Sequence, residues 1–255
     1  LTTVSHYVAE VANLVPDGRA PYTGHSAFAH KGGMHVNAVM KRPDSFEHLP
    51  PESVGNERRI LVSDYSGSST IVGKLKQVWP DLDRNDPIVA QVLERVKELE
   101  NEGYQFEAAE GSLQLLALQL KGELQRMFDL HGYRVMIHKP DETSAPYSEA
   151  TVKVSIGDRQ VHTAADGDGP VNALDNALRK ALTELFPRLQ HLQLVDYKVR
   201  VLTAEGGTAT KVRVLIETTD GETTWGTIGV HDNIIEASWQ ALVDAIVYGL
   251  LKNGG

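Results

Sequence analysis

The sequence of 255 residues contains no cysteine. Disulfide bonds, thiolate-bound metals and a cysteine nucleophile are therefore excluded, and a reducing, cytoplasmic location is expected. Basic residues are in deficit, because 25 Lys and Arg stand against 34 Asp and Glu, for a net charge of −9. An acidic chain repels phosphate backbones and anionic lipid surfaces, so we expect neither nucleic acid nor a membrane as a partner.

We expect neither a membrane span nor a leader sequence. No stretch approaches the roughly 20 apolar residues that a membrane span needs, and no secretory signal peptide is recognisable. The chain starts Leu-Thr-Thr-Val-Ser, without Met, and enters a helical pattern at once. We therefore expect a cut inside a longer protein, with a processed N-terminus as the alternative.

The first half is predicted to be mainly helical. Apolar residues recur at helical spacing, and the expected helices cover residues 1–15, 87–102 and about 110–128, with another that begins near Thr70. Near residue 131 the pattern changes to the apolar/polar alternation that is typical of strands. We place a domain boundary there, with helical linker subdomains at 1–130 and a second domain at 131–255.

The second domain contains an internal repeat. At a constant offset of 64 residues, Ala177 matches Ala241 and Leu178 matches Leu242. Three predicted strands precede each of the two amphipathic helices. The fold class is therefore α+β, with a domain of two strand–strand–strand–helix units whose remaining sheet surface is buried between units or across a dimer.

Residues 26–39 carry the clearest chemical signal, because His30 and His35 flank a Gly-Gly pair. Glycines let the backbone approach a ligand closely, and histidine exchanges protons near neutral pH. Three interpretations fit the residues alone. The first is a metal pair of the two histidines, which neither helical i,i+4 spacing nor nearby carboxylates favour. The others are a structural loop and an acid/base histidine on a loop that the glycines position.

A family resemblance favours the third interpretation. Residues 26–39 resemble the segment after the catalytic barrel in the 2-isopropylmalate, homocitrate and citramalate synthase family. The pattern there is roughly Ala-Phe-(Ala/Ser)-His-(Lys/Ser)-(Ser/Gly)-Gly-(Ile/Met/Leu)-His. Residues 54–67, Val-Gly-Asn-Glu-Arg-Arg-Ile-Leu-Val-Ser-Asp-Tyr-Ser-Gly, resemble the citramalate synthase branch most closely. His-Val-Asn-Ala at 35–38 favours the same branch, since isopropylmalate synthases usually have His-Gln-Asp-Gly.

The resemblance implies a reaction and a division of labour. Acetyl-CoA loses a methyl proton, the carbanion attacks a 2-oxo acid, and the thioester is hydrolysed; pyruvate, which gives citramalate, is the favoured 2-oxo acid. A divalent metal is expected in a missing (β/α)₈ barrel with a His-x-His pair, and no metal or cofactor site in this chain. His35 is the implied acid/base that reaches the partner subunit's barrel. The supporting loop residues are His30, Lys31, Gly32 and Gly33.

One position departs from the family pattern. The family usually has a tyrosine shortly after the second histidine, and it aligns here with Phe46. Phenylalanine has no hydroxyl group, so the role of that tyrosine is not carried over.

Residues 166–170 form the second informative segment, Asp166-Gly167-Asp168-Gly169-Pro170. The segment fits an ordinary helix start, and a glycine-rich helix start also suits an anion. Its glycine spacing is not a dinucleotide fingerprint. The resemblance implies that this domain binds the end-product amino acid near a dimer interface. We expect its carboxylate at the turn, and its side chain against Val171, Leu174 or Ile234.

These observations together predict the C-terminal part of a homodimeric acyltransferase of branched-chain amino-acid biosynthesis, inactive alone. Isoleucine is the favoured feedback effector and leucine the second. The alternatives are a 2-isopropylmalate synthase fragment with leucine feedback, a stand-alone amino-acid-binding regulatory module, and an interaction protein that only dimerises.

Overall fold

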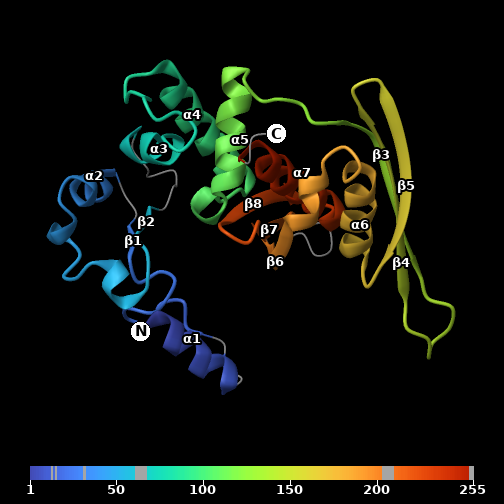
Figure 1. The fold of residues 1–255 in the computed structure, drawn as a ribbon, viewed down its shortest axis with the longest axis horizontal. Helices are drawn as coiled ribbons and strands as arrows, with labels where there is room; N and C mark the ends of the chain where they lie inside the picture. Colours follow the sequence, from blue (N-terminus) through green and yellow to red (C-terminus); the bar gives the residue numbers. More distant parts are fainter. Residues whose placement is uncertain (13, 15, 31–32, 61–67, 203–209, 253–255) are drawn as a thin grey trace. The chain divides into compact units, whose positions relative to one another are not determined.

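The computed structural model describes residues 1–255 apart from 13, 15, 31–32, 61–67, 203–209 and 253–255. The chain forms two compact units, Leu1–Glu100 and Asn101–Gly255 (Figure 1). Helix α5 (Glu110–Lys121) belongs by its contacts to the second unit, because it packs on β8 (Thr224–His231) and α7 (Ile234–Lys252). The functional boundary that the sequence suggests before residue 131 stays a prediction.

Unit 1 is mainly helical. Its short strands pair in parallel, with Ala29 opposite Arg59 and His30 opposite Ile60. Helix α2 packs against α3. In chain order the elements are α1 (Thr2–Val11), β1 (Ala29–His30), α2 (Gly33–Lys41), η1 (Pro43–Ser45), η2 (Pro51–Val54), β2 (Arg59–Ile60), α3 (Ser68–Leu75) and α4 (Pro87–Glu102).

Helix α4 confirms the predicted helix at residues 87–102. Pro87 stands at its first position, where a missing N–H group costs nothing, and the expected apolar stripe is buried at Ile88, Val92, Val96 and Leu99. Helix α1 is shorter than predicted, since it ends at Val11 instead of residue 15. Its apolar residues are exposed, at 57 to 70% of their surface: Leu1, Val4, Tyr7, Val8, Val11 and also Leu14 beyond its end.

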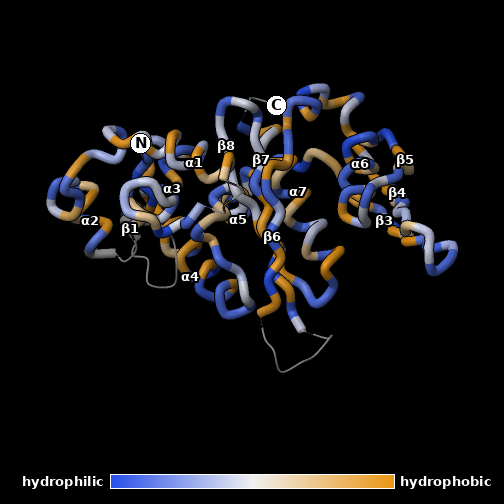
Figure 2. Tube along the Cα trace, turned by 90° about the horizontal axis from the view of Figure 1, so that it is seen from below, coloured by the Kyte–Doolittle hydropathy of each residue, from blue (hydrophilic) through white to orange (hydrophobic). Residues whose placement is uncertain are grey.

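Unit 2 confirms the α+β class and the two strand–strand–strand–helix repeats. Both sheets are antiparallel, in the orders β3-β4-β5 and β6-β7-β8. Hydrophobic and hydrophilic residues alternate along much of β6 (Figure 2). The elements after α5 are β3 (Asp129–His138), β4 (Tyr147–Ile156), β5 (Arg159–Gly167), α6 (Pro170–Leu182), η4 (Pro187–His191), β6 (Gln193–Val201), β7 (Val212–Thr219), β8 and α7.

The repeats agree in detail at the offset of 64 residues. The register of the first sheet shifts between Leu130 and Gly132, and that of the second shifts between Leu194 and Asp196. The hydroxyl of Thr163 donates to the Ala177 carbonyl at 2.8 Å, and that of Thr227 donates to the Ala241 carbonyl at 2.8 Å. Each hydroxyl ties a sheet to its own helix, so the repeat extends to individual hydrogen bonds.

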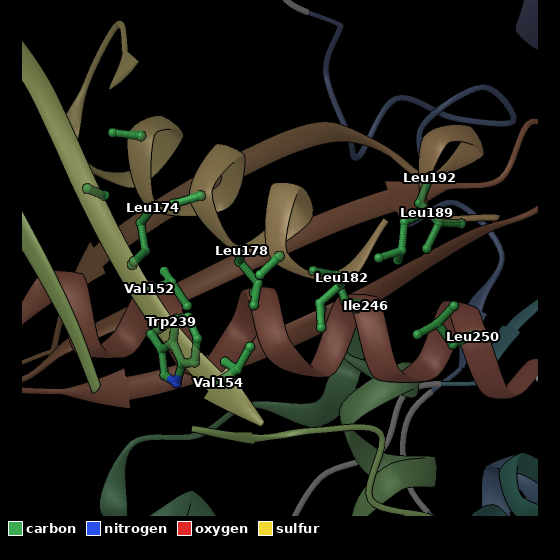
Figure 3. Close-up of a cluster of buried hydrophobic side chains, with 14 of the residues drawn as sticks. Val152, Val154, Leu174, Leu178, Leu182, Leu189, Leu192, Trp239, Ile246 and Leu250 are labelled. Atoms are coloured by element: carbon green, nitrogen blue, oxygen red, sulfur yellow. The ribbon is translucent and has the colours of Figure 1, made fainter. Parts of the chain in front are cut away.

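A shared hydrophobic core joins the two repeats. Leu174, Leu178 and Leu182 of α6 are fully buried, and they point toward Trp239 and Ile246 of α7 (Figure 3). Val152 and Val154 of β4 lie in the same cluster. The remaining sheet surface is therefore partly covered by the neighbouring repeat, as the sequence predicts.

Two expectations about unit 2 are wrong. Helix α5 ends at Lys121 instead of residue 128, because Gly122 adopts a left-handed conformation with φ 74° and closes the last turn. Helix α7 is 19 residues long and apolar enough by length and composition to cross a membrane, contrary to the expectation that no such stretch exists. Half of its apolar window is buried inside the fold, as in the core helix of a compact domain.

Candidate active site

The two predicted histidines are in contact in unit 1. His30 ends β1, and His35 lies in the first turn of α2. Their rings are tilted by 33° to each other, and His30 Nδ1 lies 2.9 Å from His35 Nε2, at hydrogen-bond distance. The short strand and the helix start thus bring together two side chains five residues apart. Gly33 begins α2, whereas Lys31 and Gly32 lie outside the described residues.

A buried carboxylate holds the other edge of the His30 ring. Glu47 is 6% exposed and His30 is 8% exposed. The His30 Nε2 atom lies 2.8 Å from Glu47 Oε1. The Arg58 guanidinium donates from Nε to Oε1 at 2.8 Å and from Nη2 to Oε2 at 2.6 Å. A continuous chain of contacts therefore runs from Arg58 through Glu47 and His30 to His35, and we call these four residues the histidine relay.

The charges within the relay are matched. The bidentate hydrogen bonds from Arg58, and then the contact with His30, lower the pKa of Glu47 although burial opposes them. Glu47 in turn raises the pKa of Arg58. Glu47 is consequently ionised near neutral pH, and an ionised carboxylate only accepts hydrogen bonds.

Phe46 packs against the outer histidine. Its ring centroid lies 3.9 Å from that of His35, with 30° between the ring planes, which is a stacked arrangement. Phe46 itself is 51% exposed. The position aligned with the family tyrosine is thus in contact with His35, but it supplies an aromatic face and no hydroxyl group.

The relay is not arranged as a metal site. Glu47 binds Nε2 of His30 and His35 binds Nδ1, so the carboxylate and the second imidazole lie on opposite edges of one ring. The expectation that no carboxylate lies near the histidines is wrong, because Glu47 is 17 residues away in sequence. Within the part of the chain that the structure describes, no group of three His, Asp or Glu side chains could hold a metal ion.

A cavity of about 400 Å³ opens in the same unit. Tyr22 lies on its wall with a positive φ of 65°, and Asn56 donates to the Tyr22 carbonyl at 2.9 Å. The Tyr22 hydroxyl lies 3.2 Å from His48 Nε2. Neither His30 nor His35 lines this cavity, whose walls are Arg19, Pro21, Tyr22, Ser26, Ala27, Phe28 and His48.

The predicted effector turn lies at the start of α6. Gly169 is the N-cap residue, with extended φ and ψ of −160° and 170°, and no side chain caps the helix there. Asn176 donates to the Asp166 carbonyl at 2.9 Å, and the Asp168 N–H donates to Asn172 at 3.2 Å. A Cβ atom at Gly167 would lie 2.3 Å from the Ala173 nitrogen, whereas one at Gly169 would meet nothing within 4 Å.

The three predicted pocket residues differ in their surroundings. Leu174 is fully buried in the core that both repeats share. Val171 is partly buried against the second cluster, which includes Ala237. Ile234 is 42% exposed at the start of α7. Their role in effector binding stays a prediction.

The sequence interpretation missed Glu47 and Arg58. Glu47 is 17 residues from His30 and 11 residues from Arg58. These separations match no metal or catalytic motif. Arg58 lies within residues 54–67, the second segment that carries the family resemblance, and this is the one sequence signal that could have pointed to the pair.

Comparison with known proteins matches both units to established families. Residues 107–250 match the family model described as the LeuA allosteric (dimerisation) domain. Residues 22–104 match the model described as homocitrate synthase post-HMGL domain-like. The first match covers most of unit 2 and the second contains the histidine relay.

Individual relatives carry two enzyme names, and those with the higher identity are named (R)-citramalate synthase. The chain is 51% identical to an (R)-citramalate synthase of Geobacter sulfurreducens, over 99% of this chain and 48% of that protein. It is also 51% identical to an (R)-citramalate synthase of Aquifex aeolicus, over 99% of this chain and 48% of that protein. A probable 2-isopropylmalate synthase of Methanopyrus kandleri is 28% identical, over 96% and 47%. The chain thus spans about half the length of the curated relatives it matches.

Proposed function

Because the chain belongs to the LeuA allosteric (dimerisation) domain family, we propose that it completes and regulates an acyltransferase that condenses acetyl-CoA with a 2-oxo acid. Pyruvate is the proposed acceptor and citramalate the product, in branched-chain amino-acid biosynthesis. The observation that carries this proposal is His35, which is held by a buried His30–Glu47 pair. The relatives named (R)-citramalate synthase support the choice of reaction.

His35 is the proposed acid/base. The relay fixes one edge of its imidazole, and stacking on Phe46 fixes the ring plane. An imidazole so held can exchange a proton with a substrate that is brought to its remaining nitrogen. The substrate is proposed to lie in the barrel of a partner subunit in a homodimer.

Among the described residues, no group of three His, Asp or Glu side chains could hold the metal of the proposed reaction. A divalent ion would polarise the 2-oxo acid and hold it for attack. The relay does not fit such an ion, because its donors diverge around His30. We propose that the ion is held by the part of the whole protein outside this chain. The exposed apolar stripe of α1 offers a surface on which such a part could pack.

Unit 2 is the proposed feedback domain. Isoleucine is the favoured effector and leucine the second, with the carboxylate bound at the turn that starts α6. The lack of a side-chain cap at Gly169 supports this assignment, since the N–H groups of Val171 and Asn172, which follow Pro170 in the first turn, are then not bonded to a cap side chain. A cytoplasmic location is part of the proposal, because a chain without cysteine requires no oxidising compartment.

The direct test uses the whole protein of which this chain is a part. With acetyl-CoA, pyruvate and a divalent metal, His35→Ala should lower kcat by about 10²-fold or more, while KM for pyruvate changes little. His162→Ala, an exposed position on β5, is the matched control. An unchanged kcat in the His35 variant would remove that residue from the mechanism, and the 255-residue chain alone should release no CoA.

The alternatives are separated by the acceptor and by binding. A 2-isopropylmalate synthase would prefer a branched 2-oxo acid to pyruvate and would respond to leucine. A stand-alone regulatory module would bind the amino acid although its gene encodes no barrel. The higher identity to the two (R)-citramalate synthases, 51% against 28%, favours the proposed condensation with pyruvate over these alternatives.

A further inference from the structure

We propose that Arg58, Glu47 and His30 are positioning residues that set the tautomer of His35 and leave its Nδ1 atom as the site of proton exchange. This inference rests on the proposed function, in which His35 is the acid/base. It adds which nitrogen of His35 acts and which side chains determine that choice.

At the buried end of the relay, the donor and the acceptor of each hydrogen bond are fixed. Arg58 donates two hydrogen bonds to Glu47, one to each carboxylate oxygen. The side chain of Glu47 is only 3% exposed, so solvent hardly competes with its partners. An ionised carboxylate has no proton to give. The nitrogen that faces it, Nε2 of His30, must therefore carry a hydrogen and donate it.

The tautomer of His30 then dictates that of His35. A neutral imidazole with hydrogen on Nε2 has a lone pair on Nδ1. His30 Nδ1 lies 2.9 Å from His35 Nε2, so His35 must donate from Nε2. In neutral His35 the lone pair is consequently on Nδ1, the nitrogen that makes no contact within the relay. Stacking on Phe46 at 3.9 Å limits rotation of the ring out of this arrangement.

The two charged members of the relay act oppositely on a positive charge placed at His35. Arg58 and Glu47 cancel each other, so the four residues carry no net charge while both imidazoles are neutral. A proton on His35 Nδ1 strengthens the hydrogen bond that Nε2 donates, because the donor becomes charged. Glu47 favours that protonated form and Arg58 disfavours it. Removing the charge of Glu47 and removing that of Arg58 should therefore have opposite effects on this protonated form.

Other charged groups are present near the relay and need to be held constant. Helix α2 itself ends in Lys41, and the helix that packs on it, α3, carries Lys74. At η1 the exposed pair Arg42–Asp44 is joined at 3.0 Å. Glu52 of η2 interacts with Arg58. These groups are left unchanged in the variants below, except where Arg42 serves as the control.

The first experiment reads the tautomers directly in the 255-residue chain. Histidine labelled with ¹⁵N gives ring-nitrogen shifts that distinguish N–H from a lone-pair nitrogen. We expect hydrogen on Nε2 and a lone pair on Nδ1 for both His30 and His35 near pH 8. Hydrogen on Nδ1 of His35 overturns the inference, whatever the activity of the enzyme. The measurement needs no variant, so a failure to fold cannot obscure it.

The second experiment uses the pH dependence of kcat in the whole enzyme. We expect Glu47→Gln to move the acidic limb of the profile to lower pH, and Arg58→Met to move it to higher pH. Arg42→Met removes an exposed charge of the same sign and should leave the limb in place. Glu47→Asp should restore the limb part of the way. Shifts of Glu47→Gln and Arg58→Met in the same direction, or no shift in either, contradict the inference.

The ¹⁵N measurement and the activity of His35→Ala together separate this inference from the proposed function. If His35→Ala keeps full activity, the acid/base role fails, even when the ¹⁵N shifts give the expected tautomers. If His35→Ala abolishes activity while His35 carries hydrogen on Nδ1, the acid/base role stands and the positioning by Glu47 fails.

Discussion

Tyr133 of β3 donates a 2.5 Å hydrogen bond to Oε2 of Glu236, in the first turn of α7. The bond crosses from the first repeat to the second. The equivalent residue 64 positions later, Tyr197, instead bonds Ser238 at 2.8 Å, within its own repeat. Burial, and then Glu236, raise the pKa of Tyr133, so the phenol stays protonated and keeps donating.

The first prediction concerns this bond. Tyr133→Phe keeps the ring beside Trp239, at 5.1 Å between centroids, but leaves the Glu236 carboxylate without its donor. We expect the free energy of unfolding to fall by about 1.5–3 kcal/mol, the range for a hydrogen bond to a charged group. Urea denaturation followed by tryptophan fluorescence measures it. Tyr147→Phe, at a ring that is 54% exposed, is the matched control and should change stability by less than about 0.5 kcal/mol.

The second prediction concerns Asp244, which links α7 to α5. Ser112 donates to its carboxylate at 2.6 Å, and burial raises the pKa of Asp244 to about 6, well above the usual range of an aspartate. A pKa that is higher in the folded state favours folding below pH 4 and loses this contribution as the pH rises through 6. The loss is at most about 3 kcal/mol for a shift of about two pH units.

The test compares the wild type with Asp244→Asn, which keeps an oxygen for Ser112 but does not titrate. We expect the variant to gain stability relative to the wild type between pH 4 and pH 7, by differential scanning calorimetry. Asp81→Asn, at an exposed position, should show no such trend. A difference between Asp244→Asn and the wild type that is constant over this range would mean that Asp244 does not titrate there.

The third prediction concerns the closeness of helix and sheet in the second repeat. A Cβ atom at Gly229 would lie 2.0 Å from the Ala237 carbonyl oxygen, so β8 and α7 approach too closely for any side chain. We expect Gly229→Ala to destabilise the chain by about 1–3 kcal/mol, as overpacking does. Gly73→Ala is the control with the opposite sign, because it meets nothing within 4 Å on a helix. Chemical denaturation measures the free energy of unfolding of both variants, and an unchanged value for Gly229→Ala would contradict the prediction.

The repeat was predictable because its signals are local and occur twice. Pairs such as Ala177 and Ala241 lie on buried helix faces at fixed spacing, and the structure places both at 0% exposure. Helix α4 was predictable for the same reason, since Pro87 and a regular apolar stripe define it. Such features depend on side chains within one or two turns of each other.

The relay was only half predictable. His30 and His35 stand in a recognisable segment, but Glu47 reaches them through the turn after η1, and Arg58 comes from the residue before β2. Tertiary folding creates these contacts, so no spacing in the sequence predicts them. The end of α5 was missed for a related reason: the apolar pattern continues beyond Gly122, and the left-handed conformation of that one residue stops the helix.

The last prediction concerns the proposed effector turn, for which the repeat supplies its own control. In α7 the side chain of Asn233 accepts a hydrogen bond from the Ile235 N–H at 2.8 Å and so caps the helix. The equivalent N-cap in α6 is Gly169, which has no side chain to do so. A carboxylate bound at α6 would take the place that the asparagine oxygen occupies in the other repeat.

Gly169→Asn should therefore copy the cap of α7 into α6. A Cβ atom at this position meets nothing within 4 Å, and its φ of −160° suits any residue, so the variant should fold. We expect isothermal titration calorimetry to show isoleucine binding to the wild-type chain, and binding at least tenfold weaker in Gly169→Asn. Thermal stability should be equal or slightly higher, because exchanging Gly for Asn at an N-cap changes stability by only about a few tenths of a kcal/mol.

Asn233→Gly is the reciprocal change, and it separates the turn from a general effect on helix ends. It should lower stability slightly, since Gly replaces an Asn cap at little cost, and should leave isoleucine binding intact. Equal binding by the wild type and Gly169→Asn would place the effector elsewhere in unit 2. Binding lost in both variants would mean that the N-termini of α6 and α7 act together, so the cap of one repeat supports the ligand site of the other.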